Sequence, residues 1–456
     1  MIDVAAAQRR LAELVAIPGV SAKAFPAEEV RRSAEAVAET MVEYGLEGVR
    51  LLETKGHPAV FGELRSSGSS EFLGSSVDGR GTPRNPRNPE ELPTILIYGH
   101  HDVQPPGREE RWLSPPFEAT VRDGRMYGRG TSDDKGGFLA YLAAIRAGEL
   151  PCNVKLLVEG EEEIGSPNLA ALLDEHRALF ACDYIVLCDT PNFDTGVPAL
   201  TYRLRGNCIV DVEVRCLAQP LHSGQGGGLV PDAIAALCTI VARLQEAIPG
   251  LDERVHVDES QLAAMRALPF DAERVRHDFG LLDGVPLRGS SWEHVWARPS
   301  LTVTAIEAIP IARAANQLSD SARARLSLRT VRDLGTAEAG ELLAKAIRSY
   351  APQGVQVDVK IAGGPSWWEA DPEHPVFARA KRALARGFGT EAVMVGSGGS
   401  IGFVAPFAEL AGDAPPLLTG VQDPRSAAHS ENESLHLGDW EKAMNSAVHL
   451  FHELAS

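Results

Sequence analysis

Four short stretches of this chain are acidic or bear histidine, and histidine, aspartate and glutamate are the residue types that bind divalent metals and transfer protons. They are GHHDVQP from Gly99, GRGTSDDKGG from Gly128, EGEEEIGS from Glu159 and LCDT from Leu187. A further histidine lies much later, in AAHSENE. Imidazole and carboxylate ligands without thiolates suit zinc, cobalt or manganese in a catalytic centre, not a closed structural site. The set therefore predicts a two-metal hydrolase.

The acidic stretch EGEEEIGS is informative by itself. Its four glutamates directly follow an apolar run, and because they repel one another we expect most of them to avoid burial. A cation would remove that penalty for some of them. A solvated acidic turn is the alternative interpretation of this stretch alone.

The elements that must position these residues follow an α/β pattern. Uniform apolar runs at 92–98, 153–158 and 184–187 are typical of strands covered on both faces, and helical stretches lie between them. Sites in such sheets form outside the carboxyl ends of the strands. A single acid or histidine there is more often a cap or turn residue, but four strand ends in succession favour a site. The residues at these ends are His100, Asp133, Glu162, Glu163 and Asp189.

The sequence changes character near Arg205. NCIVDVEVRCLA alternates like a half-solvated strand, and a strand–helix–strand pattern returns further on. We expect residues 206–363 to form an inserted α+β domain with an antiparallel sheet and helices on one face. Residues 1–205 and 364–456 should form an α/β domain with a mostly parallel twisted sheet covered by helices on both faces. The Ser-, Gly- and Pro-rich stretch 66–93 is interpreted as a surface insertion.

Composition excludes some partners. With 44 Lys and Arg against 62 Asp and Glu, the net charge of −18 argues against a nucleic-acid or anionic-membrane partner. No run of 18 apolar residues occurs. The six cysteines lack CxxC spacing and lie in apolar surroundings, which predicts buried thiols and a cytoplasmic protein.

Taken together, these motifs resemble a known family over nearly the whole chain. It is the family of two-metal metallopeptidases that includes carnosine dipeptidases, acetylornithine deacetylase, succinyl-diaminopimelate desuccinylase, aminoacylases and glutamate carboxypeptidases. GHHDVQP is similar to the family's GHxDVxP, GRGTSDDKG to its GRGxxDxKG, and EGEEEIGS to its ExxEExGS. Any one of these stretches is weak evidence, whereas the combination is highly specific.

The resemblance implies two divalent metal ions per subunit, zinc first, with manganese or cobalt as alternatives. His100 and Asp189 would bind one ion, Glu163 and His429 the other, and Asp133 would bridge them.

It also implies the groups around the metals. Asp102 would orient the His100 imidazole, and Glu162 would be the general base that moves a proton from the metal-bridging water to the leaving amine. The Asp133–Asp134 peptide bond would be cis, as it often is in this family.

Further residues would contact the substrate. His222, in LHSGQGGG, resembles a histidine that reaches across a homodimer to the partner's active site, and Asn316 falls where the dipeptidases place another partner-contributed residue. Arg329, in LSLRTV, resembles an arginine that pairs with a substrate carboxylate. The inserted domain would thus serve dimerisation or act as a lid.

His374, Gly399 and Ser400 lie where other substrate contacts are expected. The dipeptidases usually read REGGSIP, whereas this chain reads VGSGGSIG and lacks the arginine and the proline. Substrate recognition in this segment therefore departs from the family pattern.

The function implied is a binuclear hydrolase that cleaves dipeptides or short peptides bearing a free C-terminal carboxylate, by attack of a metal-bridging hydroxide. The alternative is a deacylase of N-acyl amino acids, similar to acetylornithine deacetylase or aminoacylase. A more remote alternative is an inactive family member that acts as a binding protein.

Overall fold

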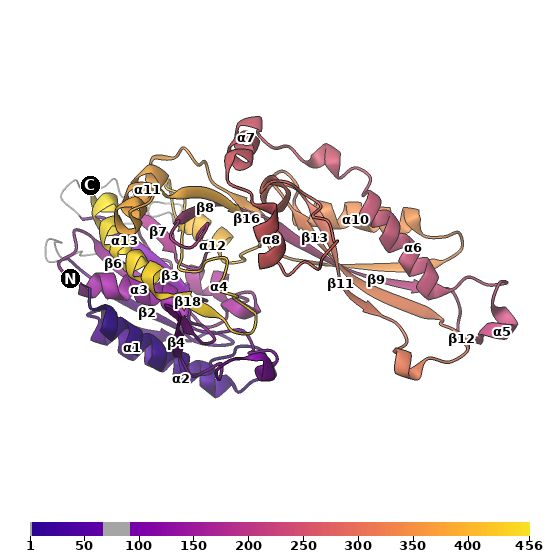
Figure 1. Ribbon diagram of the computed structural model, residues 1–456, viewed down its shortest axis with the longest axis horizontal. Coiled ribbons are helices and arrows are strands. Elements are labelled where there is room, and N and C mark those ends of the chain that lie inside the picture. The colour runs from indigo at the N-terminus through magenta and orange to yellow at the C-terminus, as the bar shows by residue number, and fades with distance from the viewer. Residues whose placement is uncertain (1, 67–91) are drawn as a thin grey trace. The chain divides into compact units, whose positions relative to one another are not determined.

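The computed structural model describes residues 2–66 and 92–456, so the predicted insertion at 66–93 lies almost wholly outside the described residues. The chain forms two compact units (Figure 1). The first comprises Met1–Tyr202, Ala370–Val395 and Gly402–Ser456, and the second comprises Arg203–Glu369 and Gly396–Ile401. The domain borders expected at 206 and 363 fall close to these divisions.

One segment differs from the predicted division. Gly396–Ile401 was expected with the first domain but belongs to the second unit. Two arginine side chains of the second unit hold it there. Arg205 Nε donates to the Gly398 carbonyl oxygen at 3.0 Å, and an Arg329 guanidinium nitrogen donates to Ser400 Oγ at 2.7 Å.

The first unit is built around a twisted sheet whose central strands are parallel. β3 pairs in parallel with β6 and β7, and β7 with β17, while the outer strands pair antiparallel. The predicted mostly parallel sheet is confirmed. The strand order is β1 (Glu47–Leu52), β2 (Ala59–Leu64), β6 (Asn153–Glu159), β3 (Thr94–His100), β7 (Tyr184–Leu187), β17 (Leu417–Leu418) and β8 (Ala199–Leu204).

Helices cover both faces of this sheet, as the uniform apolar strands predict. Successive residues of a strand point to opposite faces. The Tyr98 ring meets Phe403, directly before α12, and Phe407 of α12 at 4.4 and 4.7 Å between centroids, whereas a side chain at Gly99 would meet Phe138 of α3. The helices of this unit are α1 (Val4–Val15), α2 (Ala27–Glu43), α3 (Lys135–Arg146), α4 (Leu169–Glu175), α11 (Pro375–Phe388), α12 (Val404–Leu410) and α13 (Leu437–Ala455).

A small sheet carries two further parts of the predicted site. It orders β18 (Ser434–His436), β5 (Arg125–Tyr127) and β4 (Thr120–Arg122), all antiparallel. Its pairing brings the segment after β5 beside the segment that precedes β18. The loops holding Asp133 and His429, nearly 300 residues apart in sequence, both adjoin this sheet.

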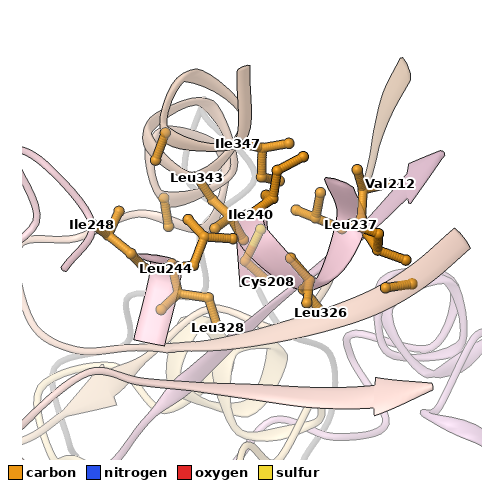
Figure 2. Packing of buried hydrophobic residues seen from close by; sticks show 14 of the residues in the cluster. Cys208, Val212, Leu237, Ile240, Leu244, Ile248, Leu326, Leu328, Leu343 and Ile347 are labelled. Atoms are coloured by element: carbon orange, nitrogen blue, oxygen red, sulfur yellow. The ribbon is translucent and has the colours of Figure 1, made fainter. Parts of the chain in front are cut away.

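The second unit contains a four-stranded antiparallel sheet in the order β11 (Ser300–Glu307), β13 (Ser321–Thr330), β9 (Gly206–Arg215), β14 (Gln356–Gly363). Burial alternates along β9, as the sequence pattern predicts. The buried face, shown in Figure 2, places Cys208, Leu326 and Leu328 against leucines and isoleucines of α6 (Ala233–Glu246) and α10 (Thr336–Tyr350). Removing one such leucine side chain would cost about 2–5 kcal/mol. The antiparallel sheet with helices on one face is confirmed.

Short elements complete the second unit. They are β10 (Leu221–His222), α5 (Ser223–Gly226), α7 (Glu259–Ala267), α8 (Ala272–Asp278), α9 (Glu293–Trp296), β12 (Gln317–Leu318), β15 (Trp368–Glu369) and β16 (Val393–Ser397), the last of which begins in the first unit. No helix of the described residues is long and apolar enough to cross a membrane. All six cysteines are free. The expectation of buried thiols is confirmed for Cys152, Cys188 and Cys208, but Cys182 and Cys216 are only half-buried and it is wrong for Cys238, which is exposed.

Candidate metal centre

Five side chains, one from the end of a strand and four from loops or turns, converge at one edge of the first unit's sheet. His100 is the last residue of β3, Asp189 follows β7, and Glu163 lies in a short 3₁₀ turn after β6. Because these three parallel strands are neighbours, their carboxyl ends deliver the side chains to one place. Asp133 precedes α3, and His429 lies in the loop before β18. We call these five residues the ligand cluster.

The cluster divides into two groups that share Asp133. In each group, one potential ligand atom per residue lies within 4.8 Å of the others. One group is His100, Asp133 and Asp189, and the second is Asp133, Glu163 and His429. This is the division expected from the resemblance.

Distances show how Asp133 connects the two groups. Its Oδ1 lies 3.1 Å from His100 Nε2, and its Oδ2 lies 3.1 Å from His429 Nε2. The outer carboxylates complete the groups: Asp189 Oδ2 is 3.7 Å from His100 Nε2, and Glu163 Oε2 is 3.2 Å from His429 Nε2. Each carboxylate oxygen of Asp133 therefore faces a different histidine, as a bridging ligand does.

The electrostatics of the cluster fit divalent cations. Burial, and then the charge of Asp133, raises the pKa of Asp189 well above its usual range and also raises that of Glu163. Hydrogen bonds to Asp133 and Glu163 raise the pKa of His429 to about 10. The carboxylates thus favour positive charge in both groups, and histidine can release its proton to a metal ion. The residues present fit two metal ions with oxygen and nitrogen ligands.

Asp102 connects the His100 segment to the turn that holds Glu162 and Glu163. Its two carboxylate oxygens accept the backbone N–H groups of Glu162 at 3.2 Å and Glu163 at 3.1 Å. His100 Nδ1 lies 2.9 Å from the Asp102 carbonyl oxygen and 3.5 Å from its carboxylate. Asp102 is thus placed to orient both the imidazole and the acidic turn.

Glu162 is half-buried beside the cluster. Burial, together with the negative charges of Glu163, Asp133 and Asp102, raises its pKa to about 8, although His100 opposes the shift. A carboxyl group that titrates near neutral pH can both accept and return a proton. This environment suits the role that the resemblance implies.

Comparison with known proteins identifies the family. Residues 96–454 match the model of peptidase family M20/M25/M40. The chain belongs to this peptidase family. It is 35% identical over 360 residues to the cysteinylglycine-S-conjugate dipeptidase of Corynebacterium striatum, covering 76% of this chain and 77% of the relative. It is 30% identical to the human Beta-Ala-His dipeptidase, over 79% and 75% of the two chains.

Solved structures support the same family assignment. The structure of human carnosine dipeptidase 1 matches with a TM-score of 0.81 and 26% identity, over 99% of this chain and 96% of the other. An M20-family metallo-carboxypeptidase from Sulfolobus solfataricus has a TM-score of 0.81 and 25% identity, over 98% of each chain. This M20 peptidase is therefore a metallopeptidase of the dipeptidase branch, as the resemblance implies.

Glu433 is a residue of this M20 peptidase that the sequence motifs missed. It is fully buried, and its Oε1 accepts the backbone N–H groups of Ser132 at 2.9 Å and Asp133 at 3.1 Å. Its Oε2 accepts from Gly130 N at 2.9 Å and from the Arg129 guanidinium at 2.7 Å. Glu433 thus holds the loop of Asp133 against the segment of His429. Its only sequence signal is its place in AAHSENE, close to the assigned histidine.

Two glutamines were missed as well, and each holds an outer carboxylate. Gln104 donates its backbone N–H to Glu163 Oε1 at 3.0 Å and its side-chain amide to Oε2 at 2.8 Å. Gln422 donates to Asp189 Oδ1 at 3.2 Å, which leaves Oδ2 on the side of His100. These contacts orient the carboxylates.

The expectation that most glutamates of EGEEEIGS avoid burial is wrong. Glu159 and Glu161 are each only 3% exposed. Glu159 accepts from the Tyr98 hydroxyl at 2.6 Å, and Glu161 accepts from the Asn168 amide at 2.8 Å. The donors that contact these two carboxylates are neutral.

A smaller expectation is confirmed. The Asp133–Asp134 peptide bond is cis. His101, between two assigned residues, is buried and packs with its Nε2 3.0 Å from the Pro58 carbonyl oxygen.

The predicted substrate contacts lie mostly on the second unit. Arg329 donates to Ser400 Oγ at 2.7 Å, and the adjacent Gly399 N–H donates to Ser397 Oγ at 3.1 Å. His222 is exposed and caps α5, and its segment pairs with β12 beside Asn316.

His374 is the exception, because it belongs to the first unit. There its Nδ1 accepts from Val376 N at 3.3 Å and caps α11. The roles of these substrate residues stay predictions.

Proposed function

We propose that this metallopeptidase hydrolyses dipeptides or short peptides with a free C-terminal carboxylate, using two divalent ions at the ligand cluster. The observation that carries the proposal is the pair of ligand groups that share Asp133. The names of the relatives support the substrate class: one is a cysteinylglycine-S-conjugate dipeptidase and another a Beta-Ala-His dipeptidase.

Each residue has a distinct task in this proposal. His100 and Asp189 hold one ion, Glu163 and His429 the other, and Asp133 both. When bound, the ions supply Lewis-acid activation of water and of the scissile carbonyl. Zinc is our first assignment, with manganese or cobalt as alternatives, because the ligands are imidazoles and carboxylates without thiolates.

Proton transfer is assigned to the acidic turn. Glu162 takes the proton from the attacking water and delivers it to the leaving amine nitrogen. Asp102 accepts the backbone N–H groups of Glu162 and Glu163 and so fixes the positions of the base and of the neighbouring ligand.

Substrate binding is assigned to the second unit and to His374. The Arg329 guanidinium pairs with the terminal carboxylate, and its hydrogen-bond partner Ser400 and the adjacent Gly399 also contact the substrate. His222 and Asn316 are contributed to the partner's active site in a homodimer, where His222 stabilises the oxyanion.

A substrate panel tests the reaction. Purified protein is incubated with zinc, manganese or cobalt and a set of dipeptides, alongside the matching N-acetyl and N-succinyl amino acids. We expect turnover of dipeptides. Activity confined to the acylated amino acids would assign the chain to the deacylases. A protein that binds no metal and cleaves neither class would be an inactive binding member of the family.

A mixing experiment tests the trans contribution. A His222→Ala chain and a Glu162→Ala chain are each expected to be inactive as homodimers. Heterodimers should regain part of the activity, because one of their two sites combines an intact base with an intact histidine. Proven heterodimers without activity would remove His222 from the trans role.

A cytoplasmic location belongs to the same proposal. All six cysteines are free thiols, which suits a reducing compartment. Fractionation of the native host, with an antibody against the chain, tests it. Recovery outside the cytoplasm would refute it.

A further inference from the structure

The polar face of the second unit's sheet carries a row of arginines. Arg323, Arg325 and Arg329 occupy alternate positions of β13, opposite to the buried leucines of the same strand. Arg325 forms a two-pronged pair with the Asp211 carboxylate at 2.7 and 2.8 Å. Arg323 donates to Glu213 at 3.0 Å. Both carboxylates come from the neighbouring strand β9, so these two cations are neutralised within the sheet.

The row ends differently at Arg329. The residues paired with it in register are Asn207 on β9 and Ser300 on β11, and both are neutral. Its guanidinium donates to Ser400 Oγ at 2.7 Å, and no carboxylate among the described residues forms an ion pair with it. Arg329 therefore lacks the carboxylate partner that the other two arginines of the row have.

A second unpaired arginine lies beside it. Arg205 is only 8% exposed and donates to three neutral oxygens: the carbonyls of Gly398 at 3.0 Å and Arg298 at 3.1 Å, and Ser300 Oγ at 3.0 Å. These bonds use Nε and one terminal nitrogen. Its second terminal nitrogen has no partner within the part of the chain that the structure describes. Ser300 and the Gly398–Ser400 segment thus contact both arginines, which we call the arginine pair.

Two neighbouring cations without an anion are costly in a buried position. Burial, and then repulsion by the charge of Arg329, lowers the pKa of Arg205 to about 10. An anionic ligand would offset both effects. Arginine offers five donors in a planar fork, so each guanidinium can bind one carboxylate through two hydrogen bonds.

We propose that the arginine pair forms a binding site for two carboxylates, so that the enzyme prefers peptides whose C-terminal residue is aspartate or glutamate. This inference rests on the proposed function, in which Arg329 binds the terminal carboxylate. Arg205 adds the specificity, because its free terminal nitrogen binds the side-chain carboxylate of the same residue. A site with Arg329 alone would serve any C-terminal residue.

Matched substrates test the inference without any mutation. Ala-Glu and Ala-Gln have nearly the same size and the same terminal carboxylate, and differ in the side-chain charge. We expect kcat/KM for Ala-Glu to exceed that for Ala-Gln by roughly tenfold to a hundredfold, as one charged hydrogen-bonded contact provides. Equal values, or a preference for Ala-Gln, would overturn the inference.

Variants locate the preference. Arg205→Gln should reduce the Glu-to-Gln ratio to near one, chiefly by raising KM for Ala-Glu. Arg205→Lys should retain part of the ratio, because it keeps the charge and loses the fork. Arg325→Gln, which removes a paired arginine of the same sheet face, is the control and should leave the ratio unchanged. If kcat/KM of the Arg205→Gln protein falls equally for both substrates, Arg205 has a structural role and the inference is overturned.

A binding measurement separates this inference from the proposed function. Calorimetry of the metal-loaded protein with the products L-glutamate and L-glutamine needs no turnover. Suppose that no dipeptide is cleaved but L-glutamate binds more tightly than L-glutamine to the wild type and not to the Arg205→Gln variant. The proposed function then fails and the two-carboxylate site stands. If dipeptides are cleaved but the two products bind equally well, the proposed function stands and the two-carboxylate site fails.

Discussion

The ligand cluster and the arginine pair are opposites in charge. At the ligand cluster, carboxylates from several strand ends lie around histidines. Burial, and then the negative charge of Asp133, raises the pKa of Asp189. At the arginine pair, two guanidinium groups lie among neutral oxygens, and no carboxylate compensates them within the described residues.

The difference shows how an unbalanced charge can indicate a ligand. Two buried arginines elsewhere in the same molecule are instead paired with carboxylates. Arg125 and Asp423 form a two-pronged pair at 2.8 and 2.9 Å, and Arg129 pairs with Glu433 at 2.7 Å. Against this background, a surplus of negative charge points to metal ions, and a surplus of positive charge points to a carboxylate ligand.

Metal removal is the strongest way to break this contrast. Dialysis against a chelator should abolish dipeptide turnover, because the ligand cluster would lose the ions that activate water. Added zinc, manganese or cobalt should restore the turnover as two equivalents bind. Metal analysis and initial rates measure the two quantities. Full activity in a protein shown to be metal-free would remove the functional meaning of the cluster.

Glu162→Gln should have the next largest effect. The amide keeps the shape of the side chain and cannot accept the proton, so kcat should fall by roughly 10²–10⁴. Metal content should stay the same, because Glu162 belongs to neither ligand group. Glu175→Gln, on the exposed side of α4, is a suitable control. A rate near that of the wild type would exclude Glu162 as the base.

Glu433→Gln should weaken metal binding. Its carboxylate accepts three backbone N–H groups between Gly130 and Asp133, and an amide nitrogen at that place would face one of those donors. We expect a loss of metal affinity of roughly 10–100-fold, typical of residues that orient ligands. Titration of metal-free protein measures it. Glu431→Gln, whose partner Arg108 lies on the surface, should bind metal normally.

Asp423→Asn tests a balanced buried charge. Leaving Arg125 without its partner should lower the free energy of unfolding by roughly 3–5 kcal/mol at neutral pH. Although burial opposes it, Arg125 holds the pKa of Asp423 below its usual range. The stabilisation is therefore present above the unfolded pKa of about 3.9 and is lost as the pH falls through the lower folded value. Denaturant melts at several pH values should show the variant approaching the wild type in acid.

Arg325→Gln should have the smallest effect. Its pair with Asp211 is solvent-exposed, and exposed pairs contribute little. We expect thermal melting and kcat/KM to match the wild type. A large loss of activity would mean that the whole row of arginines on β13, and not the arginine pair alone, serves the substrate.

Much of the ligand cluster could be predicted from local sequence. Uniform apolar runs mark the buried parallel strands, and the carboxyl ends of such strands meet at one edge, so His100 and Asp189 could be placed beside Glu163 before any coordinates. The motifs around Asp133 and His429 added the remaining two ligands.

Residues that hold the ligands in place escaped prediction for a physical reason. Glu433 binds residues about 300 positions away, and Gln422 binds Asp189 across 233 positions, so no local pattern connects the partners. The burial of Glu159 and Glu161 was also missed, because their donors, Tyr98 and Asn168, carry no charge that a sequence pattern would pair with an acid.

The sequence by itself determined the type of chemistry, since ligand types and their place at strand ends are local properties of the chain. Tertiary structure decided how charges are balanced. Arg205 is an ordinary arginine at the end of a strand until the fold buries it beside Arg329 and gives it only neutral partners. Whether a charge has a partner depends on segments that meet only in the folded chain, and for that reason the ligand cluster could be predicted and the arginine pair could not.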